Sequence, residues 1–505
     1  MGGASPENSP RERGRGNARS EQRRAPMDHS SYASPFSWRY GRKDVRSLFS
    51  ERTRRRLWRE VWIALAQAES KHGLVSEAEL ADLRAHADEI DIEAALEIER
   101  TIHHDLMAEI RVYASQARIG GGKLHLGATS MDIEDTVETY RIRRALSTIG
   151  EHLHELLAAF SERITSQAER LCMAFTHLQP AEPTTLGYRF AIYAQDLLID
   201  DANLRHVFAQ MTTKGLRGAV GTSASYEQLL GGAGASIDLE REVLGHFGLE
   251  ARAASTQTYT RKLDYLLLSA LAGIGTSLSK FAADIRILSA PPFGELAEPF
   301  GSAQVGSSAM PFKRNPILCE RIDSLARLLP AYADVAWQNA ATNYLERTLD
   351  DSANRRTTIP EALLCVDEIL SLALRVVRGL RIDERRIAQN VRTYGPFAGT
   401  ERVMMEAARA GGDRQELHET LRGRAMEAWD ALARGEDNPL ATLLSGDRSL
   451  TEFIDPAEIR RSLDPTGHVG LAARRARMVA EQIEALPEFP QQHIVAQSRA
   501  EEQRG

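Results

Sequence analysis

Apolar residues recur every three or four positions along most of this chain, which is the spacing of helices with one buried face. The longest stretches of this kind cover residues 131–170 and a segment that begins near Leu263. No long stretch of alternating β-branched residues points to a sheet. The pattern therefore predicts an all-α protein. Shorter helices are expected from Ser50 onward and over residues 76–88, 91–115, 317–345 and 353–380.

Polar segments with glycine or proline separate the long helices, at residues 120–136, 175–190, 215–226 and 301–316. Long helices divided in this way indicate a bundle whose breaks gather at its ends. One helix carries apolar residues around much of its circumference and needs more packing partners than one chain easily supplies. We therefore expect oligomerisation through the bundle. The expected domains are an N-terminal helical domain over 29–129, a central bundle over 130–382 and a C-terminal helical domain over 383–505.

The composition is that of an ordinary globular protein, with 43% hydrophobic and 26% charged residues among 505. A net charge of −7 argues against a general nucleic-acid or membrane-binding surface. Cys172, Cys319 and Cys365 match no zinc or redox spacing, which predicts reduced core thiols in a cytoplasmic protein. No uncharged apolar stretch is long enough to cross a bilayer. Residues 1–28, rich in Gly, Ser, Pro and Arg, predict a disordered tail.

The segment 301–316 carries most of the candidate chemistry. It combines glycines with the hydroxyl of Ser307, the ammonium of Lys313 and the amide of Asn315, just before a helix that begins at Ile317. Such a loop can form a lid over an anionic substrate. An ordinary surface loop is the alternative, and composition alone favours it. Phosphate-binding loops of the GxGxxG and Walker types are absent, which argues against nicotinamide or ATP-driven chemistry.

Three other polar positions allow two interpretations each. Thr129 or Ser130 can cap the helix that begins near Met131, and the same helix start can bind a carboxylate. The histidine of the pair His104–Asp105 lies inside a predicted helix, where histidines are more often structural than catalytic. His177 precedes a turn and is either a functional group or a buried histidine bonded to backbone.

Five blocks of the sequence resemble the fumarase/aspartase superfamily, and the adenylosuccinate lyase family in particular. The signature is GSSAMPFKRNP, which contains Ser307, and the block ERTLDDSANRR covers residues 346–356. The blocks GGGKLHLGATS, FTHLQP and QTYTRKLD precede them in the family's order, and the resemblance extends from Tyr32 into the C-terminal domain. It implies a three-domain all-α fold whose central long-helix bundle forms a homotetrameric core.

The resemblance also implies a role for each matching residue. Ser307 would be the general base and His177 the general acid, while Lys313 and Asn315 would bind the succinyl carboxylates and the dianionic intermediate. The remaining expected substrate contacts are a second carboxylate pair (Thr129, Ser130), a histidine–aspartate pair that lines the site (His104, Asp105), a succinyl contact (Gln257), and groups around the nucleotide and its phosphate (Arg39, Tyr40, Arg321, Arg347, Ser352, Arg356).

The implied reaction releases fumarate from adenylosuccinate and from the related succinyl-carboxamide intermediate of purine synthesis. It needs a base for a C–H next to a carboxylate, an acid for the departing nitrogen, and donors for the negative charge that develops. The implied enzyme uses no metal or organic cofactor, binds a small nucleotide, and shares its active sites between subunits.

Two departures from the family pattern keep a second hypothesis open. Glu182 and Tyr188 stand where the family commonly has glutamine and lysine. A specialised-metabolism relative that releases fumarate from another N-substituted aspartate, such as nitrosuccinate, is therefore the alternative. A catalytically silent structural relative is a third hypothesis, and the presence of both Ser307 and His177 argues against it.

Overall fold

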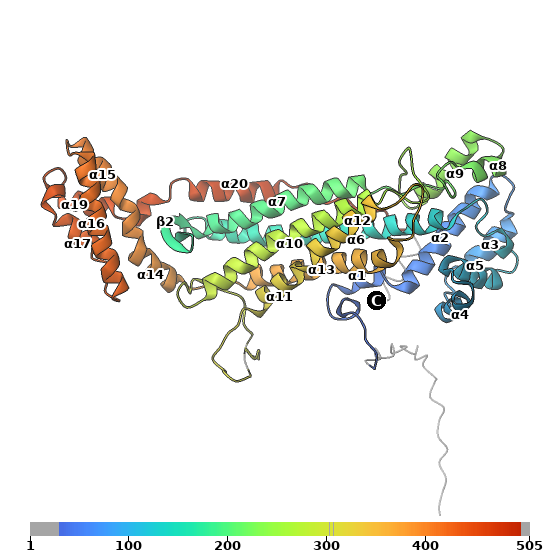
Figure 1. The fold of residues 1–505 in the computed structure, drawn as a ribbon, viewed down its shortest axis with the longest axis horizontal. Coiled ribbons are helices and arrows are strands. Elements are labelled where there is room, and N and C mark those ends of the chain that lie inside the picture. The colour runs from blue at the N-terminus through green and yellow to red at the C-terminus, as the bar shows by residue number, and fades with distance from the viewer. Residues whose placement is uncertain (1–29, 302, 307, 496–505) are drawn as a thin grey trace, which may run out of the picture.

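The computed structural model describes residues 30–301, 303–306 and 308–495, and its centre is a bundle of long helices (Figure 1). The bundle consists of α6 (Ser130–Ser166), α7 (Leu186–Gln210), α10 (Lys262–Ser289), α11 (Ile317–Ala326), α12 (Leu328–Ala341) and α13 (Ser352–Gly379). The predicted all-α class is confirmed. The described strands are β1 (Leu171–Thr176) with β2 (Gln179–Thr185), and β3 (Leu296–Ala297) with β4 (Arg381–Ile382), each pair antiparallel.

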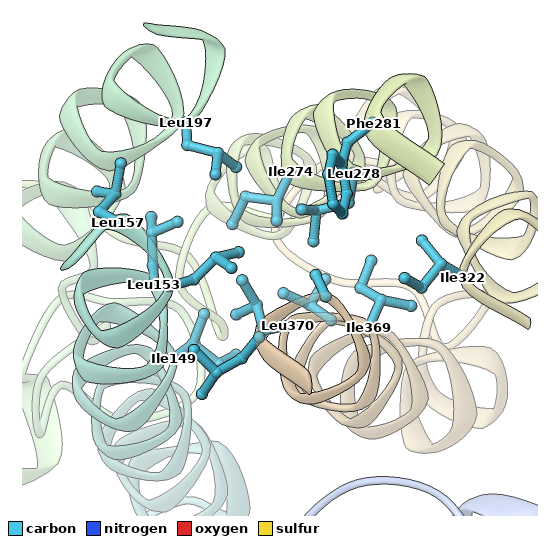
Figure 2. Packing of buried hydrophobic residues seen from close by; sticks show 14 of the residues in the cluster. Ile149, Leu153, Leu157, Leu197, Ile274, Leu278, Phe281, Ile322, Ile369 and Leu370 are labelled. Carbon is cyan, nitrogen blue, oxygen red and sulfur yellow. The ribbon is translucent and has the colours of Figure 1, made fainter. Parts of the chain in front are cut away.

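The core of the bundle follows from the helical spacing of its apolar residues. Each long helix directs one stripe of leucines, isoleucines and phenylalanines inward, and α10 contributes from Leu263 to Leu288. The residues that meet in Figure 2 come from α6 (Ile149, Leu153, Leu157), α7 (Leu197), α10 (Ile274, Leu278, Phe281), α11 (Ile322) and α13 (Ile369, Leu370). Burial of these side chains, at roughly 1.5–3 kcal/mol each, stabilises the bundle.

Two predicted helices are each divided in the structure. The expected helix over 91–115 is divided into α4 (Ile92–Ile102) and α5 (Asp105–Gln116). The division occurs because His103 takes a left-handed backbone conformation (φ 54°) that ends α4. The expected helix over 317–345 is divided at Arg327 into α11 and α12. The helix predicted over 131–170 is α6, which ends at Ser166.

The N-terminal hydrophobic cluster includes more of the chain than the predicted domain over 29–129. Its helices are α2 (Glu51–Ser70), α3 (Glu77–Ala85), α5 and the start of α6, joined by α8 (Ala224–Leu230) and α9 (Ala233–His246). Tyr226, Val243 and Phe247 are buried with the side chains of α2. The segment that holds η1 (Pro35–Ser37) and α1 (Lys43–Leu48) instead contributes Phe36 and Val45 to the core of the bundle.

The C-terminal hydrophobic cluster covers less of the chain than the predicted domain over 383–505. Its own core is formed by α15 (Thr400–Arg409), α16 (Arg414–Ala433), α17 (Leu440–Ser445), α18 (Arg448–Thr451) and α19 (Pro456–Ser462). The helix before them, α14 (Glu384–Tyr394), contributes Ile387 to the core of the bundle. The last helix, α20 (Ala472–Glu484), leaves this cluster and lies along α7 (Figure 1). Ala476, Ala480 and Ile483 are buried in the bundle core. The C-terminal hydrophobic cluster therefore ends before α20.

Residues 486–495, here called the C-terminal strap, run from α20 to the N-terminal cluster. Phe489 covers Gly150 of α6 so closely that a Cβ atom there would lie 2.1 Å from its ring. The Gln492 N–H donates to Ser147 Oγ (2.9 Å), and Val495 is buried in the N-terminal cluster. The strap therefore joins two hydrophobic clusters.

Candidate active site

Most of the predicted site residues lie at two ends of the bundle. Thr129 and Ser130 stand at the start of α6, whereas His177 lies beyond the other end of this helix. At about 1.5 Å per residue, the 37 residues of α6 separate these positions by about 55 Å. We name the two groups the Thr129 end (His104, Asp105, Thr129, Ser130, Gln257, Arg347, Ser352, Arg356) and the His177 end (His177 with the loop 301–316).

At the Thr129 end, residues from three helices are in direct contact. Ser130 Oγ lies 3.3 Å from His104 Nε2, and the Arg356 guanidinium donates to Asp105 Oδ2 (2.7 Å). The Met107 N–H donates to His104 Nδ1 (3.3 Å), which makes Nε2 the protonated nitrogen and Ser130 Oγ its acceptor. The structure thus brings His104, Asp105, Ser130 and Arg356 into one group of polar side chains.

The charge of Asp105 is maintained by its neighbours. Burial by itself would raise its pKa, but Arg356 and Arg54 reverse that effect and lower the pKa below the usual value. One turn after Ser130 and on the same face of α6 lies Glu134, which the sequence analysis missed. Burial, followed by repulsion from Asp105, raises the pKa of Glu134 to about 8. Its carboxyl is therefore largely protonated at neutral pH and can donate a hydrogen bond.

Gln257 and Arg347 belong to the same end through backbone and side-chain contacts. The Gln257 N–H donates to the Glu346 carbonyl (3.2 Å), and Arg347 Nη1 donates to Asp351 Oδ1 (2.8 Å). Asp351 directly precedes Ser352, the first residue of α13.

Beneath these residues lies a buried ion-pair network. The guanidinium of Arg261, with a fully buried side chain, donates to Asp351 (2.6 Å) and to Asp135 of α6 (3.1 Å). Although burial would raise it, the pKa of Asp351 is lowered by Arg261 and Arg347. The network fixes the starts of α6, α10 and α13 relative to one another.

At the His177 end, the predicted acid stands at the tip of the β1–β2 hairpin. His177 (φ 54°) and Leu178 (φ 61°) both have left-handed backbone conformations, which are unfavourable for residues with side chains. His177 is exposed, so the alternative of a buried histidine is wrong. Phe175 packs edge to face on Phe293 (5.0 Å between centroids), which holds the hairpin beside the segment that leads to the loop. The sequence analysis placed a turn here but missed the strands.

The loop 301–316 folds back on itself. Ser307, the predicted base, lies outside the described residues. Asn315 Nδ2 donates to the Gly306 carbonyl (3.0 Å), and a Cβ atom at Gly306 would lie 2.0 Å from the Lys313 carbonyl. Beyond the loop, the buried carboxylate of Glu298 accepts the N–H groups of Leu318 and Cys319 (3.0 Å each) and anchors the start of α11. Lys313 is exposed.

Three predicted phosphate or nucleotide contacts lie apart from the Thr129 end within one chain. Arg321 is on α11, which follows the loop 301–316. Arg39 is exposed, with its guanidinium near the Trp38 ring (5.7 Å) and the Tyr40 ring (5.9 Å). The next residue, Gly41, donates its N–H to Glu368 (3.0 Å), which attaches this segment to α13.

The two departures from the family pattern have different surroundings. Glu182 is exposed on β2. Tyr188 lines a pocket beside the hairpin tip together with Leu178, Ile192 and Phe293. Tyr188 is therefore close to the predicted acid, and Glu182 is a solvated side chain.

The cysteines and the apolar helix α10 have structural explanations. Cys172, Cys319 and Cys365 are buried, as predicted, and burial raises the pKa of Cys172 to about 11. Among the described helices, α10 has the length and composition of a membrane span. Its apolar residues from Leu263 to Leu288 form the core of the bundle, which accounts for that composition.

Comparisons with known proteins agree with this architecture. Residues 40–328 match the family model described as Lyase, and residues 396–479 match the one described as Adenylosuccinate lyase C-terminus. Adenylosuccinate lyase of Schizosaccharomyces pombe is 34% identical over 88% of this chain and 93% of its own length. The chain belongs to the adenylosuccinate lyase family. The enzyme of that name from Pyrococcus horikoshii is 31% identical over 90% of this chain and 98% of its own length.

Solved structures extend the likeness to the superfamily fold. A fumarate lyase from Mesorhizobium sp. BNC1 superposes with a TM-score of 0.77 at 24% identity, covering 89% of this chain and 99% of its own. A 3-carboxy-cis,cis-muconate lactonizing enzyme from Pseudomonas putida also gives 0.77, at 25% identity and the same coverage. The expected fold and lyase class are confirmed, and membership of the adenylosuccinate lyase family does not favour the alternative substrate.

Proposed function

We propose that this protein cleaves adenylosuccinate to AMP and fumarate, and the related succinyl-carboxamide nucleotide in the same way. Its place in the adenylosuccinate lyase family supports the reaction. We propose a cytoplasmic enzyme whose catalytic groups are Ser307 and His177. The observation that carries the arrangement of the site is the distance of about 55 Å between the two groups of residues in one chain.

No nucleotide reaches across such a distance, so a complete site requires more than one copy of the chain. A second copy packed antiparallel would bring its His177 end to the Thr129 end of the first. Apolar side chains exposed on the bundle support this packing, because they would otherwise face water: Ile192 and Ile199 on α7 and Trp337 on α12. We propose a homotetramer built around the central helices, with each site shared between subunits.

In such a site the elimination proceeds by general acid–base chemistry. Ser307 removes the proton from the carbon next to a succinyl carboxylate, and the C–N bond electrons pass to the nitrogen as the double bond of fumarate forms. His177 supplies the proton that the departing nitrogen requires. Lys313 and Asn315 stabilise the extra negative charge on the carboxylate.

The other end holds the rest of the substrate. The start of α6 presents backbone N–H groups and the hydroxyls of Thr129 and Ser130 to a carboxylate. Arg356 and Arg347 supply guanidinium forks suited to phosphate oxygens. Gln257 contacts the succinyl group, and Arg39, Tyr40, Arg321 and Ser352 complete the nucleotide site across subunits.

The test is turnover by purified protein. Adenylosuccinate is mixed with the wild-type enzyme, with Ser307→Ala and with His177→Ala, while fumarate and AMP are followed. Turnover by the wild type, with a loss of about 10²–10⁴-fold in each variant, is expected. Turnover of a phosphate-free aminosuccinate without any of adenylosuccinate would overturn the proposed substrate.

Shared sites are tested by mixing His177→Ala with Arg356→Met, a variant that is defective at the Thr129 end. After joint unfolding and refolding, some sites would combine the intact Thr129 end of one chain with the intact His177 end of another, and activity should return. A His177→Ala/Arg356→Met double variant refolded with itself is the matched control and should stay inactive. A fully active monomer would overturn the shared arrangement.

A further inference from the structure

The start of α6 depends on a buried ion pair that no expected catalytic role explains. Asp132 lies in the first turn of α6, two residues after Ser130, and Lys214 lies between α7 and α8. Both side chains are fully buried, and they form an ion pair. A buried charge is unfavourable by several kcal/mol unless it is paired and hydrogen-bonded, so the surroundings of this pair must compensate for it.

The carboxylate of Asp132 accepts hydrogen bonds from two separate segments. On its own helix start, the Thr129 N–H donates to Oδ2 (2.9 Å). On the segment after α7, the Arg217 N–H donates to Oδ1 (3.0 Å) and the Gly218 N–H to Oδ2 (3.2 Å). Lys214 Nζ also donates to the Gly218 carbonyl (3.0 Å). One carboxylate therefore links the Thr129–Ser130 turn to residues 214–218.

Helix capping alone does not account for these contacts. An aspartate in the first turn commonly accepts the N–H of the capping residue, which here is Thr129. The bonds from Lys214, Arg217 and Gly218 to the Asp132 carboxylate satisfy no backbone group of α6. They attach the turn to another part of the chain.

The other side of the turn is also closely packed. Gly127 has a left-handed conformation (φ 66°), and a Cβ atom there would lie 3.1 Å from the buried ring of Tyr226. Nearby, His125 accepts a hydrogen bond from Trp62 (3.1 Å), and burial lowers its pKa to about 4. His125 is thus neutral near pH 7, so the positive charge that balances the Asp132 carboxylate comes from Lys214.

We infer that Asp132 and Lys214 are positioning residues for substrate binding, acting through the Thr129–Ser130 turn. This inference rests on the proposed function, since it assigns the turn to a substrate carboxylate. The pair fixes the turn against residues 214–218, so the hydroxyls and N–H groups of the turn meet the carboxylate without rearrangement. Loss of the pair should weaken binding of adenylosuccinate more than it slows the chemical step at the His177 end.

The experiment compares Asp132→Asn with a matched control, Glu109→Gln. Glu109 is equally buried and pairs with Arg55 (2.9 Å) and Arg59 (2.7 Å) in the same cluster, but none of these bonds reaches the turn. At a temperature where both variants are folded by circular dichroism, Asp132→Asn should raise KM for adenylosuccinate on the order of tenfold to a hundredfold. Glu109→Gln should lower the Tm while KM and kcat stay at wild-type values. Equal KM values for the two variants would overturn the inference.

A double-mutant cycle with Ser130→Ala separates positioning from general destabilisation. If Asp132 acts through the turn, the KM effect of Asp132→Asn should shrink when Ser130→Ala is already present, whereas Glu109→Gln should combine additively. Additive effects for Asp132→Asn would contradict the inference. If Asp132→Asn does not fold, Asp132→Asn/Lys214→Met removes both charges and takes its place in the cycle.

Hydrogen exchange provides a readout that does not depend on the reaction. Amides of residues 125–130 should exchange faster in Asp132→Asn than in the wild type or in Glu109→Gln. A wild type without turnover of adenylosuccinate would overturn the proposed function. Unchanged exchange in Asp132→Asn would overturn the positioning role itself.

Discussion

The two ends of the bundle are built in opposite ways. At the Thr129 end, Arg261, Asp135 and Asp351 form a buried network under side chains that are already hydrogen-bonded to one another. At the His177 end, an exposed histidine stands at a hairpin tip near an exposed loop. In the proposed shared site, the binding half would be organised within each subunit, whereas the proton-transferring half would be completed by contacts with another subunit.

The largest effect should come from His177→Ala, which removes the predicted acid from an exposed position. We expect kcat to fall by about 10²–10⁴-fold, because proton donation to the departing nitrogen is lost. The urea midpoint should not change, since the side chain is exposed. His418→Ala, at an exposed histidine on α16, is the control and should keep wild-type activity. Equal activities of the two variants would remove His177 from the mechanism.

Disrupting the network at the Thr129 end should instead reduce stability. Arg261→Met leaves the buried carboxylates of Asp135 and Asp351 without their shared cation, and the free energy of unfolding should fall by about 3–5 kcal/mol. Arg477→Met breaks an exposed ion pair with Glu169 and should change it by less than about 1 kcal/mol. Urea unfolding of both variants measures the difference, and similar values would contradict the role given to burial.

Glu69 on α2 should make the N-terminal cluster sensitive to pH. It is 1% exposed, neither carboxyl oxygen has a hydrogen-bond partner among the described residues, and burial raises its pKa to about 8. The contribution of the protonated Glu69 carboxyl to the free energy of unfolding is fully present below about pH 4.5. It is lost by up to about 1.4 kcal/mol per pH unit as the pH rises to 8.

Glu69→Gln cannot lose a proton, so its free energy of unfolding should vary less between pH 5 and 8 than that of the wild type. Urea midpoints at each pH provide the measurement. Glu93→Gln, at an exposed position of α4, should keep the wild-type slope. Parallel curves for Glu69→Gln and wild type would show that Glu69 is ionised in the folded protein.

The smallest effect is expected from Gly306→Ala at the His177 end. The new Cβ atom would lie 2.0 Å from the Lys313 carbonyl, so the loop must shift and misplace the groups proposed to act in catalysis. We expect kcat to fall about tenfold without a change in Tm. Gly122→Ala is the control, because no atom lies within 4 Å of its added Cβ. A wild-type kcat for Gly306→Ala would show that the loop tolerates the shift.

Local patterns predicted the helices and the family but not the long-range contacts. The apolar spacing of α6, α10 and α13 was clear because one face of each helix is buried. The break at His103 was missed, since a left-handed histidine has no strong sequence signal. The return of α20 to the bundle was missed because an apolar stripe does not identify the surface that it packs against.

The candidate site likewise has a part that the sequence predicted and a part that it did not. Its residues were found by resemblance, and the contacts among His104, Ser130, Asp105 and Arg356 support that grouping. Asp132 and Glu134 were not identified as site residues from the sequence. Asp132 pairs with Lys214, and the pKa of Glu134 depends on the charges of Asp105 and Arg54. These partners are distant in sequence, so no local pattern could have identified the two carboxyls.

The fold can be completed only after the ribosome has made the C-terminal strap. Val495 donates its N–H to the hydroxyl of Tyr140 across 355 positions of sequence, and Phe489 fills the space over Gly150. At roughly 20 residues per second, a ribosome needs more than about 15 seconds to make the intervening chain. Until then, the apolar surface that the strap covers on α6 is open to chaperones or to neighbouring nascent chains.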